Sequence, residues 1–292
     1  MPQLEALAEY PFHPHFAFID GHRMAYLDEG RGPVIVMLHG NPSWSYLYRN
    51  LVGQLKNQYR CIVPDHLGCG FSDKPQNATY TLQAHIDRLE LLLNTLQIER
   101  CVLMVHDWGG AIGMGWAALH VGKISGFIVC NTAAFPFPRI PWRIAICRWP
   151  LLGPLLVRGA NAFARAAVHM ATCKKMLPEV ARSFLAPYNS WANRIAILRF
   201  VDDIPMQPSH PSWPSLLQVE AGLLNFVSSP MLICWGGADF CFNHQFYSEW
   251  LRRFPRAEAH YFPEASHYLL EDALEEITPH IARFLVQINH AA

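Results

Sequence analysis

Three residues that can act together in nucleophilic catalysis lie far apart in the sequence, namely Asp107, Asp239 and His267. Each follows an apolar run that predicts a buried strand, and open α/β sheets bind their ligands at the ends of strands. Asp107 lies in the stretch VHDWGG, residues 105–110. This stretch has the form of the nucleophile elbow G-x-S-x-G, with aspartate in the serine position and Val105 in place of the first glycine.

The order of these three residues along the chain is that of nucleophile, acid and base in an α/β-hydrolase. Each residue alone has a simpler interpretation: Asp107 could cap the next helix, and His267 could be a capping or surface histidine. Three such residues in this order, each at a predicted strand end, favour a catalytic triad. Asp272, close to His267, is expected to be an acidic residue in the first turn of a helix.

The stretch HGNP (residues 39–42) follows the first buried strand, where this fold builds its oxyanion hole. We expect the backbone N–H groups of Asn41 and Trp108 to stabilise a developing negative oxygen. The amide of Asn41 and the indole N–H of Trp108 are expected to hold the leaving anion, whether this is a halide or a carboxylate.

An aspartate nucleophile restricts the reaction. When Asp107 attacks a saturated carbon, it displaces a leaving group and forms an alkyl ester with the enzyme. Water activated by His267 can cleave that ester at its own carbonyl, whereas a serine would leave an ether that water cannot cleave. The sequence therefore predicts opening of a C–X or C–O bond at a saturated carbon.

Apolar runs and helical periodicity alternate along most of the chain. Strands are predicted at 16–20, 23–29, 34–39, 61–65, 101–106, 126–131, 231–235 and 257–262, and helices at 46–55, 80–96, 108–120, 244–254 and 269–289. This order predicts an α/β-hydrolase fold with a mostly parallel, eight-stranded sheet and helices on both sides.

Residues 136–213 interrupt this alternation, because they contain helical segments but no clear strand. We interpret them as a helical cap domain inserted into a core domain formed by residues 1–135 and 214–292. The cap contains ten Lys or Arg and three Asp or Glu, so its net charge is +7 and that of the rest is −7. Its arginine stems could simply cover apolar helices, or the cap could dock on a membrane surface or an acidic partner.

The stretch LLGPLLV (151–157) could be cap core or could line a tunnel for an acyl chain.

The composition excludes several classes of protein. Lys plus Arg and Asp plus Glu both number 23, so no bulk charge attracts nucleic acid. Hydrophobic residues make up 51%, which allows a large core and leaves apolar surface for a cavity that binds a small apolar substrate. No apolar run of 18 residues is present, so we expect no membrane span.

No cofactor or metal is expected. The histidines lack the HExxH and Cys/His spacings of zinc sites, and the glycine-rich loop at 64–75 lacks the GKS/T of a phosphate loop. The eight cysteines form no CxxC pair, and the first ten residues contain two Glu and no Lys or Arg, unlike a signal peptide. We therefore expect reduced thiols and a cytoplasmic location.

Several stretches resemble the haloalkane dehalogenase branch of the α/β-hydrolases: HGNPSWSYLYRNL, PDHLGCGFSDKP, HDWGG, NTAAFP, WGGADFCF and SHYLLEDA. The resemblance covers nearly the whole chain. It implies that Asp107 is the nucleophile, His267 the base and Asp239 the acid, and that Asn41 and Trp108 hold the leaving group. Thr-Ala-Ala stands after Asn131, where another subgroup has a glutamate, which points to the third dehalogenase subgroup.

Within this branch, the cap stretches PWRIA (141–145), APYNSWANRI (186–195) and DIP (203–205) resemble the β-lactone decarboxylases of bacterial long-chain olefin biosynthesis. That resemblance implies conversion of a long-chain cis-β-lactone to a cis-alkene and CO2. It also implies association with partner enzymes, often at membranes, which would suit the basic cap.

Other functions remain open. A haloalkane dehalogenase would use the same residues on a halogenated alkane. An epoxide hydrolase usually needs cap tyrosines, and the cap contains only Tyr188. A binding protein that uses the hydrolase fold without catalysis is disfavoured by the complete triad.

Overall fold

The computed structural model describes residues 7–291, so most of the first ten residues considered above lie outside the described part of the chain. The core is one eight-stranded sheet with the order β1-β2-β4-β3-β5-β6-β7-β8. Its strands are β1 (His15–Ile19), β2 (His22–Glu29), β3 (Val34–Leu38), β4 (Arg60–Pro64), β5 (Cys101–Asp107), β6 (Ile124–Thr132), β7 (Met231–Gly236) and β8 (Glu258–Phe262). The predicted eight-stranded sheet is confirmed.

Only β2 runs against its neighbours, because it pairs antiparallel with both β1 and β4. From β4 to β8 every pairing is parallel. The carboxyl ends of β3, β5, β6, β7 and β8 therefore meet at one edge of the sheet. These central strands are apolar and buried along almost their whole length, as expected for strands covered on both faces.

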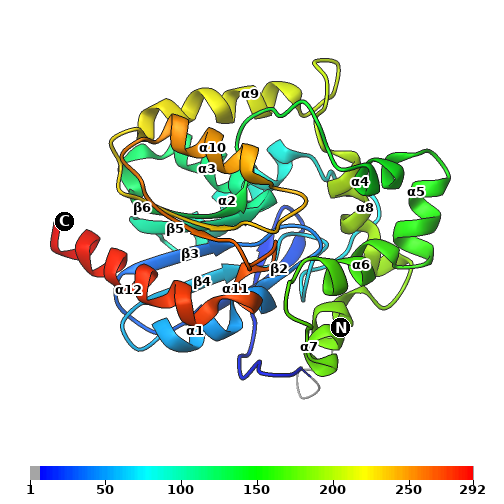
Figure 1. Ribbon diagram of the computed structural model, residues 1–292. Coiled ribbons are helices and arrows are strands. Elements are labelled where there is room, and N and C mark those ends of the chain that lie inside the picture. Colours follow the sequence, from blue (N-terminus) through cyan, green and yellow to red (C-terminus); the bar gives the residue numbers. More distant parts are fainter. Residues whose placement is uncertain (1–6, 292) are drawn as a thin grey trace.

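Helices cover both faces of the sheet (Figure 1). One face carries α2 (Leu82–Thr95), α3 (Trp108–Leu119), α9 (Trp213–Gly222) and α10 (His244–Arg253), and the other carries α1 (Arg49–Leu55), α11 (Leu269–Asp272) and α12 (Leu274–Ala291). Each layer of helices packs its own cluster of buried apolar side chains against the sheet.

The single helix predicted at 269–289 is wrong, because the chain forms two helices separated by Ala273 with φ −134° and ψ 26°. The break is held by tertiary contacts that periodicity does not reveal. The carboxylate of Asp272, the last residue of α11, accepts hydrogen bonds from backbone N–H groups of Ser266 and of the cap.

The cap consists of short helices inserted between β6 and β7. They are α4 (Trp142–Ala145), α5 (Leu152–Pro154), α6 (Ala162–Met170), α7 (Pro178–Leu185) and α8 (Ile195–Asp202). In Figure 1 they lie together on the right, to one side of the sheet. The helix that follows, α9, packs on α3 beside the sheet. The exact division of the chain at residues 136 and 213 stays a prediction.

Two further expectations concern cysteines and membranes. All eight cysteines are free thiols, and six of them are buried. Within residues 7–291, none of the helices combines the length and the apolar character that crossing a bilayer requires.

Candidate active site

Asp107 ends β5 and stands directly before α3, in a backbone conformation with φ 51° and ψ −124°. A positive φ is uncommon for a residue with a side chain and is typical of strained functional turns. The turn is tightly packed, because a Cβ at Gly109 would collide with the Leu38 carbonyl and one at Gly110 with the Thr132 hydroxyl. The Thr132 hydroxyl also donates a hydrogen bond to the Asp107 carbonyl. The sequence around Asp107 therefore forms the predicted sharp turn.

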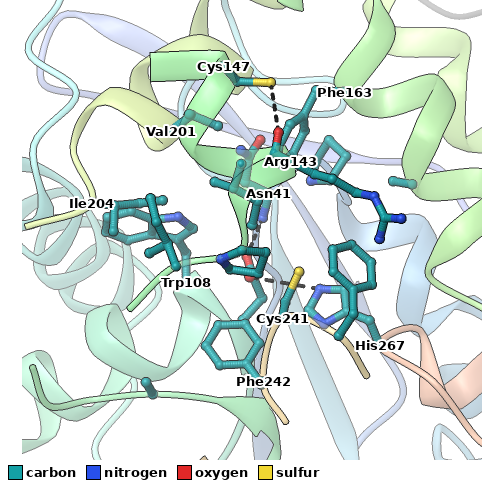
Figure 2. A pocket seen from close by; sticks show the side chains of 18 of the residues that line it. Asn41, Trp108, Arg143, Cys147, Phe163, Val201, Ile204, Cys241, Phe242 and His267 are labelled. Carbon is teal, nitrogen blue, oxygen red and sulfur yellow. Dashed lines mark hydrogen bonds and ion pairs between the residues drawn. The ribbon is translucent and has the colours of Figure 1, made fainter. Parts of the chain in front are cut away.

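The structure brings Asp107, Asp239 and His267 together at the carboxyl edge of the sheet. The Nδ1 atom of His267 lies 2.8 Å from Oδ2 of Asp239. Its Nε2 atom faces Asp107, at 3.8 Å from Oδ2. All three side chains are buried, and Figure 2 shows His267 beside the pocket. A carboxylate on Nδ1 fixes the imidazole tautomer, so Nε2 is free to take a proton from water next to Asp107.

Electrostatics couples the members of the triad. Burial alone would lower the pKa of His267, but the charge and hydrogen bond of Asp239 and the charge of Asp107 leave this pKa raised. Burial raises the pKa of Asp107, and the charge of His267 with the N–H groups of Asn41 and Trp108 oppose that rise. The site is thus built to hold charge on an imidazole between two carboxylates.

The backbone N–H groups expected to form the oxyanion hole point at Asp107 itself. The Asn41 N–H donates to Oδ1 of Asp107 at 2.6 Å, and the Trp108 N–H also donates to this carboxylate. Gly40 makes the approach possible, because any Cβ there would overlap the Asp107 side chain. Once Asp107 is esterified, Oδ1 is its carbonyl oxygen, so these donors are placed to stabilise the negative charge formed when water attacks.

The side chains of Asn41 and Trp108 both line the pocket. Asn41 donates one amide hydrogen to the Ile197 carbonyl in α8 at 3.2 Å, which ties the core to the cap. The Trp108 ring lies 5.2 Å from that of Phe200, and its indole N–H has no protein acceptor among the described residues. One Asn41 amide hydrogen and the indole N–H therefore remain available to an anion in the pocket.

Three residues that contact the site were not singled out for this purpose from the sequence. Asn131 donates to Oδ2 of Asp239 at 3.0 Å and also bonds both backbone groups of Gly236. His106 bonds the His267 carbonyl through Nε2 at 2.8 Å, and burial holds its pKa well below the ordinary value. Thr132 supports the elbow as described above. Asparagine just before a strand end is the one signal that could have indicated Asn131.

Asp272 lies in the first turn of α11, as predicted, and its carboxylate also makes contacts outside the helix. It is buried, and its carboxylate accepts backbone hydrogen bonds from Ser266, Cys173 and Lys174. One carboxylate thus joins the loop that carries His267 to the loop after α6. Besides its place in the helix turn, Asp272 thus forms a tertiary contact through three backbone N–H donors.

A cavity of about 390 Å³ opens on the triad beneath the cap. Its walls are mostly apolar, with Phe135, Phe163, Val201, Leu216 and Phe246 among them, and Asp107 and His267 line it too. Of the stretch 151–157, Leu156 lines the cavity, Val157 is buried and Leu151 and Leu155 are exposed. Both interpretations of that stretch therefore hold for some of its residues.

No tyrosine lines this cavity in the described part of the chain. Tyr188, the cap tyrosine that an epoxide hydrolase would need, is buried and donates from its hydroxyl to the Ser43 carbonyl. This placement disfavours epoxide opening.

Two further features lie outside this cavity, a loop noted in the sequence and a cluster that only the structure brings together. In the glycine-rich loop, the buried Asp65 carboxylate accepts hydrogen bonds from the backbone N–H groups of Ser45 and Phe71. These bonds attach the loop to the core. On β8 and α12, Glu258, His260 and His280 are close enough to share a metal ion, but Glu258 is already paired with Arg283.

The sheet order, the elbow at Asp107 and the inserted cap together define an α/β-hydrolase. The family model described as "alpha/beta hydrolase fold" matches residues 33–274, so the chain belongs to this family of enzymes. A cis-3-alkyl-4-alkyloxetan-2-one decarboxylase of Shewanella oneidensis is 45% identical over 289 residues, which cover 97% of this chain and 91% of the relative. Haloalkane dehalogenase 2 of Mycobacterium bovis is 29% identical over 92% of this chain and 93% of its own. The crystal structure of a haloalkane dehalogenase from Bradyrhizobium elkani superposes with a TM-score of 0.88, over 96% of this chain and all of the other, at 24% identity.

Proposed function

We propose that this enzyme is a β-lactone decarboxylase that converts a cis-3,4-dialkyl β-lactone to a cis-alkene and CO2. The observation that carries the proposal is a buried aspartate on a nucleophile elbow, facing an apolar cavity under the cap. The oxetan-2-one named for the 45% identical relative is a β-lactone with two alkyl groups, and the cavity suits such a molecule.

In the first step, Oδ2 of Asp107 attacks the saturated ring carbon that bears the ring oxygen. The C–O bond breaks and its electrons stay on the former lactone carboxyl group. This carboxylate is positioned to accept hydrogen bonds from the Asn41 amide and the Trp108 indole. The configuration at the attacked carbon is inverted, and the product is an alkyl ester of Asp107.

In the second step, the bond between the carboxylate and its carbon breaks, and the electron pair forms the C=C bond while Asp107 leaves as a carboxylate. Inversion in the first step places the substrate carboxylate and the ester oxygen anti to each other. Anti elimination then puts both alkyl groups on the same side, so a cis-lactone gives a cis-alkene. The sequence consumes no water and returns Asp107 to its starting state.

The direct test is gas chromatography of the products from a cis-dialkyl β-lactone, with Asp107→Ala as the control. Because the lactone also decarboxylates thermally, it must be extracted and detected cold. We expect cis-alkene from the wild type and only the thermal background from Asp107→Ala. Alkene formed equally by both proteins would contradict the role of Asp107.

A second candidate is hydrolysis of haloalkanes. The observation that favours it is Nε2 of His267 facing Asp107 at 3.8 Å, which is suited to activating the water that cleaves an alkyl ester. The related dehalogenase supports the same possibility. Bromide released from a bromoalkane, without alkene from the lactone, would establish this function in place of the first. Quenching of Trp108 fluorescence by halide would show that an anion occupies the expected place.

We further propose that the enzyme works in the cytoplasm. The support is that all eight cysteines are free thiols, in keeping with a reducing compartment. Fractionation of cells followed by immunodetection tests this location.

A further inference from the structure

One short stretch of the cap exposes four large apolar side chains to solvent, and we call them the cap patch: Trp142, Trp149, Leu151 and Leu155. Their exposed fractions are 69%, 60%, 84% and 61%. Leu151 is the N-cap residue of α5 and Leu155 follows one turn later, with the Leu155 N–H directed at the Leu151 carbonyl. Exposed apolar clusters of this kind usually mark an interaction surface.

The charge around the cap patch is predominantly positive, although Asp202 and Asp203 act on Arg148 from beyond ion-pair distance. The nearby basic residues Arg139, Arg143, Arg148 and Arg165 have no carboxylate within ion-pair distance in the described part of the chain. Other cap arginines are used within the fold, since Arg158 and Arg194 donate to backbone carbonyls. No acidic residue occurs between Asp107 and Glu179. Hydrogen bonds within the fold therefore account for Arg158 and Arg194 but not for the arginines near the cap patch.

The cap patch lies at the mouth of the active-site cavity. Trp142 is largely exposed and also lines the cavity, and Arg139, Arg143 and Leu156 from the same stretch line it too. In Figure 2, Arg143 lies beside the pocket near Phe163. A surface held against the cap patch would thus stand next to the entrance of an apolar cavity.

We propose that the cap patch docks on an anionic lipid bilayer, with its Trp and Leu side chains at the headgroup level and the unpaired arginines against lipid phosphates. Tryptophan and leucine next to arginine are the residue types that bind this interface. An acidic protein would match the arginines but would leave four apolar side chains without a partner of their own kind, so a bilayer fits both observations. Delivery of a long-chain lactone from the bilayer to the cavity rests on the proposed function, whereas docking itself does not.

The test is cosedimentation of the full chain with vesicles of phosphatidylglycerol and phosphatidylethanolamine, compared with phosphatidylcholine vesicles. We expect wild-type protein to sediment with the anionic vesicles at low salt and to be released at high salt. Leu151→Ser with Leu155→Ser should weaken binding by about tenfold or more. The matched control is Leu119→Ser with Leu224→Ser, which removes leucines that are 67% and 76% exposed on the core domain and should bind like the wild type.

A second pair of variants tests the charges. Arg148→Gln with Arg165→Gln should weaken binding to anionic vesicles by about tenfold, whereas Arg100→Gln with Arg256→Gln on the core domain should not. None of these substituted residues lines the cavity. Unchanged melting curves and unchanged turnover of a short bromoalkane or lactone, where the wild type turns one over, show that the variants are folded.

Wild-type protein that stays in the supernatant with anionic vesicles at low salt would overturn the proposal, as would equal binding to phosphatidylcholine. So would cap-patch variants that sediment like the wild type. Retention on an acidic polypeptide column without vesicle binding would assign the patch to a protein partner instead. Vesicle binding without turnover of a lactone would keep the docking surface and discard the proposed substrate.

Discussion

Asp107 limits the chemistry more than any other residue. The alkyl ester that it forms with the substrate can break down by two routes. Water attack at the ester carbonyl needs His267 as a base and produces an alcohol. Decarboxylative elimination needs neither water nor proton transfer and returns Asp107 unchanged. The donors from Asn41 and Trp108 serve both routes, since they stabilise either a tetrahedral oxyanion or the departing carboxylate.

The two routes differ in what they leave on Asp107. If the enzyme turns over in water enriched in oxygen-18, ester hydrolysis inserts a solvent oxygen into the Asp107 carboxylate. We expect no label in Asp107 after many turnovers of a β-lactone, and label after many turnovers of a bromoalkane. Mass spectrometry of the peptide that contains Asp107 makes the measurement. Label acquired during lactone turnover would contradict the elimination step.

The two routes also differ in their dependence on pH. A base must be neutral to accept a proton, and the pKa of His267 is raised from its ordinary value of 6.5. Hydrolysis of a bromoalkane should therefore rise with pH as His267 becomes neutral, at a lower pH than in the free enzyme because esterification removes the charge of Asp107 that raises this pKa. Alkene formation should lack this rise, because the protonated imidazole assists the departure of Asp107. Single-turnover rates across the pH range test this, and one shared profile for both substrates would count against it.

At the scale of the elements, the strand ends hold the triad and Asn131 connects two of them. It is the penultimate residue of β6, with φ 31°, and its side chain bonds Asp239 and both backbone groups of Gly236 at the end of β7. The acid of the triad is thus held by the neighbouring strand as well as by the Cys241 N–H at 2.6 Å.

We expect Asn131→Ala to lower the free energy of unfolding by roughly 2–4 kcal/mol. The change leaves a buried N–H of Gly236 unpaired and places an alanine at positive φ. Asn131→Gly is the matched variant, since it loses the same hydrogen bonds but tolerates the backbone, and it should be less destabilised by about 1 kcal/mol. Chemical denaturation measures both. Equal stability of the two variants would show that backbone strain plays no part.

The order of strands and helices could be predicted because buried parallel strands are continuous apolar runs, as in β5 and β7. The triad could be predicted because each member follows such a run. Asn131 and Asp272 could not, because their partners lie 105 or 108 residues away for Asn131 and 98 or 99 in the cap for Asp272. The break at Ala273 escaped for the same reason, since the surrounding residues keep a helical pattern.

At the scale of the whole molecule, separate hydrogen bonds attach the cap to the core around the cavity. Asn41 bonds the Ile197 carbonyl, Asp203 accepts the Leu82 N–H at 2.7 Å, and the Tyr268 N–H donates to the Ala171 carbonyl at 2.6 Å. Charge is divided between the same two parts, with +7 in the cap and −7 in the rest. The excess of positive charge therefore lies in the part of the chain that covers the active site.

Asp272 is the attachment whose loss is most readily measured. Asp272→Ala leaves the N–H groups of Cys173, Lys174 and the buried Ser266 without their acceptor, which should cost roughly 2–3 kcal/mol of stability. The loop after α6 contains Lys174 and Lys175, both exposed, so limited trypsin digestion should cut there faster in Asp272→Ala than in the wild type. Glu275→Ala removes an exposed carboxylate in α12 and should change neither stability nor cleavage. Faster cleavage elsewhere with residues 174 and 175 still protected would mean that Asp272 stabilises the His267 loop without holding the cap.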